Sequence, residues 1–312
     1  MGKYFGTDGV RGLANAQLTP ELAFKLGRCG AARLMKEGGK PFIVLGRDTR
    51  RSGTMLESAL AAGICSVGVD VRRLGVATTP SVAWITKRFG ALAGVMISAS
   101  HNPAPDNGIK FFSSQGFKLP DRIEAEIEEM IDAPVDELPH PSGEGIGIVT
   151  FDSALLEDYI RFAIGILPGR LEGMKVAVDC ANGAAYEIGP RVLKALGAEV
   201  TVLSDRPNGD NINLDCGSTH LEALIAEVRR GPYDLGLAFD GDADRLLAVD
   251  EQGNVVDGDR IMLICFKHMR RLGLLRSPSV VATVMSNLGF EKAVEAEGGQ
   301  LIRTKVGDRY VL

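Results

Sequence analysis

The chain has 312 residues, which at about 100–200 residues per domain predicts two or three domains with cores of their own. Apolar residues make up 45% and charged residues 24% of the chain, which excludes a disordered or fibrous protein. The net charge of −5, without long runs of one sign, argues against a nucleic-acid or membrane surface. We therefore expect a small-molecule partner. The oligomeric state is left open, with a homo-oligomer as one option.

Cellular location is indicated by two absent signals and by the usage of cysteine. No stretch approaches the roughly 18 uninterrupted apolar residues of a spanning helix, and the first residues contain no apolar signal region. The five cysteines are odd in number, lie far apart and show no paired metal spacing. We expect a cytoplasmic protein whose thiols are mostly buried.

The first half of the chain alternates apolar runs with amphipathic stretches. The pattern predicts strands at 42–45, 69–76 and 92–97 and helices at 52–67 and 80–88. This alternation is typical of βαβ units around a parallel sheet. An acidic helix expected at 121–131 is followed by 133–150, which is rich in Pro, Gly and Ser and is predicted to be a linker.

The alternation then restarts twice. A second series predicts helices at 153–164 and 186–196 and strands at 175–179, 199–203 and 235–239. After a hairpin near 250–254, a third series predicts helices at 260–272 and from Phe290, and strands at 280–284 and 301–304. The expected fold class is α/β, with consecutive βαβ-built domains and mixed, mostly parallel sheets. We place the domains at 1–150, 151–253 and a shortened 254–312.

An acidic loop follows the predicted strand 235–239. It carries alternate carboxylates at Asp240, Asp242 and Asp244, at a strand end where ligand sites of open α/β sheets form. Three oxygen ligands suit Mg²⁺ or Ca²⁺, and the lack of nearby His or Cys argues against zinc. An EF-hand is excluded because Arg245 stands where that loop requires Gly. The alternative is a solvated acidic turn, although such close carboxylates repel one another without a cation.

A second polar loop, Ser98-Ala99-Ser100-His101-Asn102-Pro103, ends the predicted strand 92–97, and a turn into a hairpin is expected at 106–110. Serine beside histidine suggests a hydrolase, but there is no Gly-x-Ser-x-Gly elbow and no identifiable acid. The alternative is that Ser and Asn cap a turn before proline.

Two loops rich in glycine and arginine, 5–12 and 46–53, are candidate phosphate ligands, as is 303–309 more weakly. Neither of the first two has the spacing of a P-loop or a dinucleotide site. Ordinary surface turns remain the alternative for each.

Taken together, residues 98–103, 106–110 and 240–245 resemble the motifs of the α-D-phosphohexomutase superfamily. Further segments resemble the bacterial phosphoglucosamine mutases within it: 5–12, 97–112, 179–184, 211–213, 216–220 and 306–311. The resemblance covers essentially the whole chain. It implies a fuller third domain and a fourth domain beyond residue 312, and leaves open whether these 312 residues turn over substrate alone.

The resemblance implies a mutase that interconverts glucosamine 6-phosphate and glucosamine 1-phosphate, through a phosphoserine and a bisphosphate, on the route to UDP-N-acetylglucosamine and cell-wall precursors. Ser100 would carry the phosphoryl group in the first domain. Asp240, Asp242 and Asp244 of the second domain, with a phosphoryl oxygen on Ser100, would hold Mg²⁺. Phosphomannomutase or phosphoglucomutase activity is the alternative, as is a fragment that binds metal and phosphate without turnover.

The resemblance also assigns supporting residues. Arg11, Lys110 and Arg245 would supply cationic donors near the phosphoserine, and Lys110 or Arg11 would assist proton transfer. His101 is assigned to positioning. Arg245, together with Asp308 and Arg309 in the third domain, is expected to bind the hexosamine phosphate.

Overall fold

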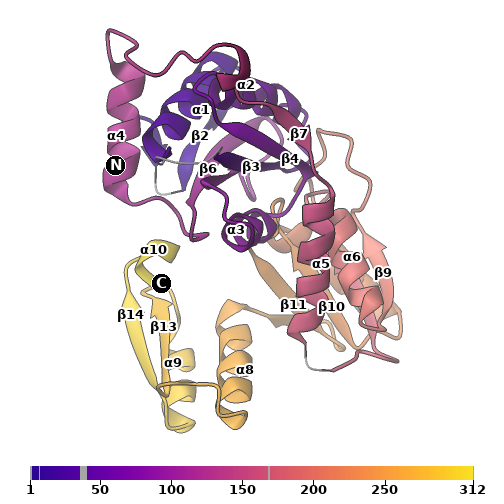
Figure 1. Ribbon diagram of the computed structural model, residues 1–312. Helices are drawn as coiled ribbons and strands as arrows, with labels where there is room; N and C mark the ends of the chain where they lie inside the picture. The colour runs from indigo at the N-terminus through magenta and orange to yellow at the C-terminus, as the bar shows by residue number, and fades with distance from the viewer. Residues whose placement is uncertain (1, 7, 36–40, 168, 312) are drawn as a thin grey trace.

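The structure, a computed structural model, describes residues 2–6, 8–35, 41–167 and 169–311. Figure 1 shows three α/β units in chain order, the first above, the second to the right and the third, drawn in orange to yellow, below. We call them the first, second and third units. No helix in the described part of the chain is long and apolar enough to cross a membrane.

The first unit is built on a seven-stranded sheet in the order β1-β2-β6-β5-β3-β4-β7. Its strands are β1 (Phe5–Gly6), β2 (Gly9–Leu13), β3 (Phe42–Arg47), β4 (Asp70–Val76), β5 (Ala93–Ile97), β6 (Asp106–Ser113) and β7 (Val149–Phe151). Its helices are α1 (Pro20–Leu34), α2 (Gly53–Cys65), α3 (Thr79–Arg88) and α4 (Asp121–Asp132).

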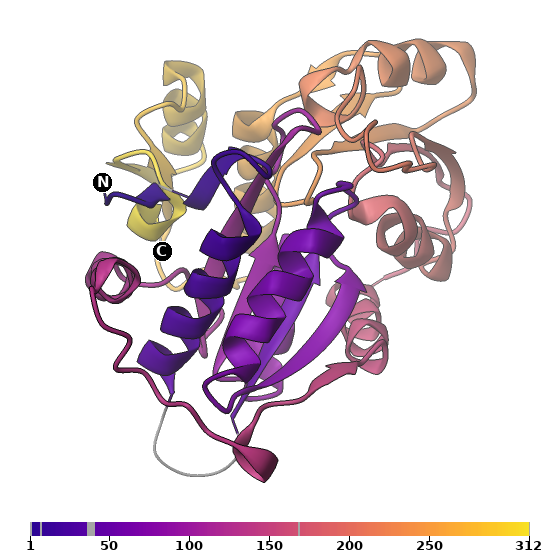
Figure 2. The same ribbon diagram turned by 90° about the horizontal axis from the view of Figure 1, so that it is seen from above.

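Helices cover both faces of this sheet because alternate strand residues point to opposite sides. Ile43 and Leu45 pack in the core with α1, α2 and α4, whereas Val44 packs in the core with α3 and α5 (Ala154–Ile166). Figure 2 shows α1 and α2 side by side over one face. They lie so close that a Cβ on Gly63 would stand 2.1 Å from the Phe24 carbonyl oxygen. Glycine therefore permits this helix crossing.

The second unit has a five-stranded sheet in the order β12-β11-β10-β8-β9. Its strands are β8 (Lys175–Asp179), β9 (Glu199–Leu203), β10 (Leu235–Phe239), β11 (Leu246–Asp250) and β12 (Val255–Val256), with helices α6 (Ala185–Ala195) and α7 (Glu222–Arg230). The third unit comprises α8 (Gly258–Arg271), β13 (Ser279–Thr283), α9 (Leu288–Ala296), β14 (Gln300–Thr304) and α10 (Asp308–Val311).

The predicted α/β class is confirmed, and in the described residues six strand pairs are parallel and five antiparallel. Two local predictions were wrong. Residues 106–110 are not a turn but the start of β6, which pairs with β2 and β5. The segment 133–150 is not only a linker, since its end enters β7 and extends the first sheet beside β4. Helices α1 and α7 were not predicted.

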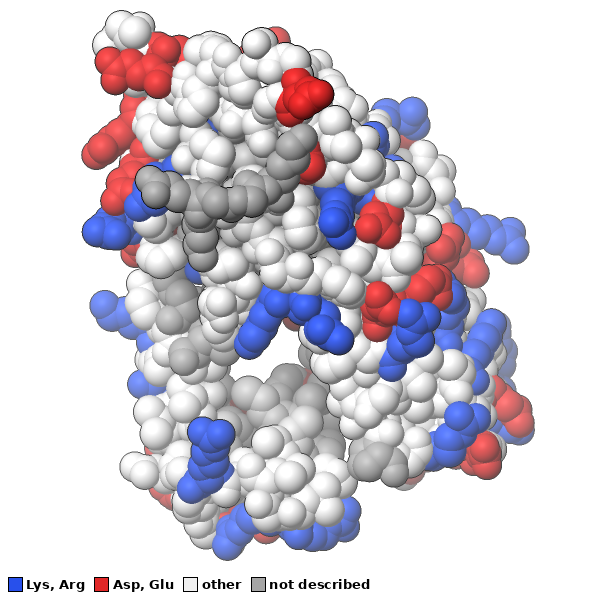
Figure 3. All heavy atoms as spheres, viewed as in Figure 1, with Lys and Arg blue, Asp and Glu red and all other residues white. Residues whose placement is uncertain are grey.

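All five cysteines lie in the described part of the chain and are free thiols, four of them buried and Cys265 exposed, as the sequence indicated. The surface charge is unevenly spread. Figure 3, viewed as Figure 1, shows Lys and Arg side chains gathered over α3 at the edge of a hollow between the first and third units.

Candidate active site

The loops that follow β5 and β10 meet at the boundary of the first and second units. Ser100 lies on the first loop (residues 98–105, the Ser100 loop) and Asp240 on the second (residues 240–245, the acidic loop). The Ser100 Oγ hydroxyl donates a 2.5 Å hydrogen bond to Asp240 Oδ2, although 140 residues separate them. Both residues are almost completely buried. The structure thus joins the two motifs at the carboxyl ends of their strands.

The acidic loop gathers three carboxylates into one cluster. Asp240, Asp242 and Asp244 each offer a carboxylate oxygen, and these oxygens lie within 4.8 Å of one another. Asp242 Oδ1 is buried and has no hydrogen-bond partner in the described part of the structure. An orphaned buried carboxylate oxygen is costly unless a cation or donor satisfies it. The donor set therefore fits a hard divalent cation.

The electrostatics of the cluster agree with this conclusion. Burial, together with the charges of Asp242 and Asp244, raises the pKa of Asp240 to about 7. Burial would also raise the pKa of Asp242, but the Lys110 ammonium outweighs it and holds that pKa below its usual value. Negative charge at Asp240 is therefore poorly balanced by the protein.

Lys110, on β6, provides the main positive charge. Its Nζ lies 2.9 Å from Asp242 Oδ2, 3.4 Å from Asp244 Oδ2 and 3.1 Å from Asp8 Oδ2. Burial lowers the pKa of Lys110, but the charges of Asp242, Asp244 and Asp8 outweigh burial and raise it above its ordinary value. Lys110 is therefore a cation at neutral pH.

Asp8 is a site residue that sequence reasoning missed, although it lies in the loop 5–12. It pairs with Arg11, Lys110 and Lys118, and Lys110 and Lys118 overcome the effect of burial to hold the pKa of Asp8 well below its usual range. The sequence feature that could have identified Asp8 was its position near Arg11 in the same loop. Thr79, which binds Asp242, had no such signal.

Arg11 and His101 stand beside the Ser100 loop. Arg11 Nη1 donates to Asn102 Oδ1 at 3.3 Å, and its buried Nε has no partner among the described residues. His101 Nδ1 is likewise buried without a partner there. Burial and the charges of Arg245 and Arg11 lower the pKa of His101, which favours the neutral ring. No acid orients His101 in the described structure, so it does not form a hydrolase triad.

The residues expected to bind substrate are less defined. Arg245 is exposed, with its Nε 3.8 Å from Asp244 Oδ1. The side chains of Asp308 and Arg309 lie outside the described residues, so their role stays a prediction. Arg303, in the weaker candidate loop 303–309, is committed to Glu291 and to the carbonyl of Ser286.

The three arginines of the loop 46–53 are engaged with other protein groups, and of these Arg50 is buried away from any phosphate. Arg50 is fully buried and bonds carbonyl groups of the Ser100 loop. Arg47 lies against Glu57, and Arg51 is paired with Asp210 of the second unit. The sequence pattern could not distinguish an arginine that binds an anion from one that binds carbonyl groups, because both need a cation beside a tight turn.

Comparison with known proteins agrees with this geometry. Residues 2–136, 157–253 and 257–312 match the phosphoglucomutase/phosphomannomutase alpha/beta/alpha domains I, II and III. The chain is 56% identical over its whole length to a phosphoglucosamine mutase of Desulforamulus reducens and covers 70% of that protein. The chain belongs to the phosphoglucosamine mutase family. The family enzyme of Bacillus subtilis is 55% identical, again with 70% of its length covered.

Solved structures of the wider superfamily share the fold. A phosphoglucomutase/phosphomannomutase family protein of Burkholderia thailandensis superposes with a TM-score of 0.84 at 26% identity, over 100% of this chain and 68% of that one. An Aspergillus fumigatus N-acetylphosphoglucosamine mutase, solved with GlcNAc-6P and magnesium, superposes with a TM-score of 0.63 at 19% identity over 99% of this chain and 63% of that one. Members of the phosphoglucosamine mutase family are isomerases that transfer a phosphoryl group within a sugar phosphate, and this assigns the chain to that class of enzyme.

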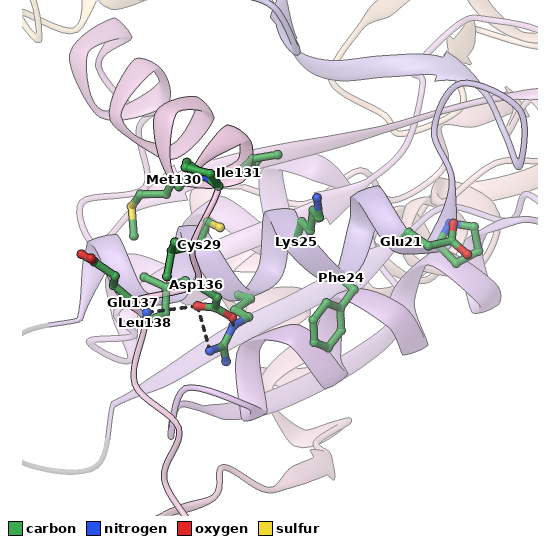
Figure 4. Close-up of a pocket in the computed structure, with 14 residues that line it drawn as sticks. Glu21, Phe24, Lys25, Cys29, Met130, Ile131, Asp136, Glu137 and Leu138 are labelled. Atoms are coloured by element: carbon green, nitrogen blue, oxygen red, sulfur yellow. Dashed lines mark hydrogen bonds and ion pairs between the residues drawn. The ribbon is translucent and has the colours of Figure 1, made fainter.

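A cavity of about 890 Å³ shares no residue with this site. It lies between α1 and the segment that follows α4, and Figure 4 shows Phe24, Cys29 and Met130 among its lining side chains. Asp136 at its edge is paired with Arg28. Apolar side chains such as Phe24, Met130 and Ile131 make up much of the lining of the cavity.

Proposed function

We propose that this chain interconverts glucosamine 6-phosphate and glucosamine 1-phosphate, with Ser100 as the residue that carries the phosphoryl group. The observation that carries the proposal is the contact between Ser100 Oγ and Asp240 within the three-carboxylate cluster. A hydroxyl buried beside a candidate cation site is placed for phosphoryl transfer. The sugar is taken from the curated relatives, which are phosphoglucosamine mutases.

The proposed reaction has two transfers. In the first, the P–O bond to Ser100 Oγ breaks and a P–O bond to the free sugar hydroxyl forms, which gives a sugar bisphosphate. In the second, the other phosphoryl group of the bisphosphate passes to Ser100 Oγ. Each time the proton of the attacking hydroxyl ends on the oxygen that leaves, so both transfers balance. Lys110, held as a cation by Asp242 and Asp244, stabilises the negative charge on the transferring group.

The proposed metal is Mg²⁺, held by Asp240, Asp242, Asp244 and a phosphoryl oxygen on Ser100. Three carboxylate oxygens and a phosphoryl oxygen are the hard ligands that this ion prefers. When bound, the ion neutralises charge on the transferring phosphoryl group. The proposal extends to Arg11 and His101 as residues that orient the Ser100 loop.

Substrate contacts and location belong to the same proposal. Arg245, Asp308 and Arg309 are proposed to bind the hexosamine phosphate. The five free cysteines support a reducing cytoplasm. Phosphomannomutase and phosphoglucomutase activity are separated from the proposed activity by assays of the full-length enzyme with the three hexose phosphates.

The decisive experiment combines mass and activity. Intact-mass and peptide analysis of the purified enzyme should find about 80 Da of phosphate on Ser100. Ser100→Ala should abolish mutase activity because alanine has no oxygen to carry the group. Ser58→Ala is the matched control, since Ser58 is an exposed serine of α2 that bonds only the Thr54 carbonyl in the described structure. Full activity of Ser100→Ala would exclude the phosphoserine.

A further inference from the structure

Arg50 and Asn213, from different units, bind the same two carbonyl oxygens of the Ser100 loop. Arg50 Nη2 donates to the carbonyl oxygens of Ser100 and Asn102 at 3.0 and 2.8 Å. Asn213 Nδ2 donates to the same two oxygens at 2.9 and 3.0 Å. The guanidinium of Arg50 and the side-chain amide of Asn213 therefore both hold the loop by the carbonyl oxygens of Ser100 and Asn102.

The loop needs such support because of its backbone conformation. Ser100 has a φ of +52°, in the left-handed region that residues with a Cβ adopt only at an energetic cost. Such a conformation persists when surrounding contacts over-determine it. The Ser100 amide donates to Ser98 Oγ at 2.9 Å, and Ser98 Oγ in turn donates to Asp48 at 2.6 Å. The four carbonyl contacts complete this support.

The Arg50 side chain makes all of its hydrogen bonds to the Ser100 loop and to the residues beside it. Its Nε donates to Asp48 at 2.9 Å, and its Nη1 donates to the carbonyls of Pro103 and Asp106. With the two Nη2 contacts, all five N–H donors of the guanidinium are used within the protein. The side chain is fully buried, so it is unavailable to a substrate phosphate.

Asn213 connects the second unit to the same loop. Its own φ is +58°, and its backbone N–H donates to the carbonyl of Ala181 at 2.9 Å. The acidic loop packs directly against this contact. A Cβ on Gly241 would lie 2.5 Å from the Ser100 carbonyl oxygen and 2.9 Å from Asn213 Nδ2. The carbonyl of Ser100 is thus enclosed between Arg50, Asn213 and the backbone of the acidic loop.

We propose that Arg50 and Asn213 are positioning residues, which hold the Ser100 loop so that Ser100 Oγ points at Asp240. The inference rests on the proposed function, since it concerns the oxygen that carries the phosphoryl group. Neither side chain bonds Ser100 Oγ itself. Their loss should leave substrate binding intact and slow the transfer, because a displacement of about 1 Å at a reacting atom costs about 100-fold in rate.

The test uses two variants of the full-length enzyme, each with a control that makes the same substitution nearby. Asn213→Gly removes the amide at a position where glycine accepts the backbone conformation, and Asp215→Gly is its control on an exposed residue with a φ of +51°. Arg50→Lys removes the fork of donors, and Arg51→Lys is its control on an exposed arginine that pairs with Asp210.

We expect kcat to fall about 30- to 100-fold in Asn213→Gly and Arg50→Lys, with KM and the Kd for Mg²⁺ within about twofold of the parent. The phosphorus-31 resonance of the phosphorylated enzyme should shift or broaden in both variants. The controls should match the parent in kcat and in this resonance. If Arg50→Lys does not fold, Asn213→Gly decides alone.

Two results would overturn the inference. One is a kcat within threefold of the parent with an unchanged phosphorus resonance. The other is a parallel loss of kcat, Mg²⁺ affinity and melting temperature in Asn213→Gly, which would indicate a general structural role. Ser100→Ala, assayed in parallel, separates this test from the proposed function: an active Ser100→Ala refutes the function, whereas an inactive Ser100→Ala with fully active positioning variants refutes only the inference.

Discussion

Thr79, at the start of α3 in the first unit, binds Asp242 of the second unit through two hydrogen bonds. The Thr79 amide donates to the Asp242 carbonyl at 2.9 Å, and Thr79 Oγ1 donates to Asp242 Oδ2 at 2.6 Å. The bonded oxygen fixes the carboxylate, while Oδ1 of the same carboxylate stays unpaired within the described structure. The first unit thereby orients a candidate metal ligand of the second, as outer partners of metal ligands do.

Thr79→Val should therefore weaken Mg²⁺ binding about 10- to 100-fold, because valine keeps the shape of threonine but cannot orient Asp242. Calorimetric titration of the metal-free enzyme with Mg²⁺ measures the affinity. Thr86→Val is the matched control, since Thr86 is a buried threonine of the same helix that bonds the Val82 carbonyl. Equal Mg²⁺ affinity in the two variants would contradict the orienting role.

The carboxylates of the acidic loop should respond differently to neutralisation. The pKa of Asp240 is raised to about 7 by burial and by Asp242 and Asp244, so its charge is unfavourable in the folded state without a cation. Asp242, in contrast, is paired with Lys110. In EDTA at pH 8, Asp240→Asn should melt no lower than the parent, whereas Asp242→Asn should melt lower because it leaves Lys110 with one fewer partner.

Both variants should lose most of the rise in melting temperature that Mg²⁺ gives the parent, because a ligand stabilises in proportion to RT ln(1 + [L]/Kd). Thermal melting in EDTA and in excess Mg²⁺ measures both effects. An unchanged Mg²⁺-dependent shift in both variants would mean that the acidic loop is a solvated turn.

Glu124 of α4 should make stability depend on pH. Burial, opposed by Lys118 and assisted by Glu128, raises its pKa to about 7. Because the folded pKa exceeds the unfolded value, the stabilising contribution of Glu124 is complete below about pH 4.5 and is lost as pH rises through about 7. Glu124→Gln has no such charge to bury. As pH rises from about 4.5 to above 7, its free energy of unfolding should therefore increase by about 1–3 kcal/mol relative to that of the parent.

Melting temperatures at pH 4.5 and pH 8 test this prediction. Glu129→Gln is the control on the same helix, since Glu129 is exposed. If the melting temperatures of the parent and Glu124→Gln differ by the same amount at both pH values, the prediction is wrong.

Gly63→Ala should destabilise the first unit by about 1–3 kcal/mol, because the added Cβ meets the Phe24 carbonyl and forces α1 and α2 apart. Gly165→Ala is the control, since no atom lies within 4 Å of its added Cβ. That helical substitution should be neutral or stabilising by up to about 1 kcal/mol. Thermal unfolding compares the two, and equal melting temperatures would show that the helices adjust freely.

The sequence by itself predicted the α/β class, most strands and the two central motifs. Strands such as β8 and β10 were found within a residue because their apolar runs end abruptly at polar loops, which is a local property. Asp240 was recognised for the same reason, since it follows its strand directly, whereas Ser100 was assigned through the resemblance of residues 98–103 to a known family. Residues 106–110 were taken for a turn because Asp, Asn and Gly favour turns, and the pairing of β6 with two strands overrode that preference.

Only the tertiary structure decided which side chains serve these motifs. Thr79 lies 163 residues from Asp242, and Asn213 lies 113 residues from Ser100, so no local pattern relates them. Arg50 has the same local sequence whether it faces an anion or a carbonyl group, and its burial against the Ser100 loop settles the choice. The physical reason is that a hydrogen bond depends on distance in space, which the order of strands in the two sheets determines and the spacing along the chain does not.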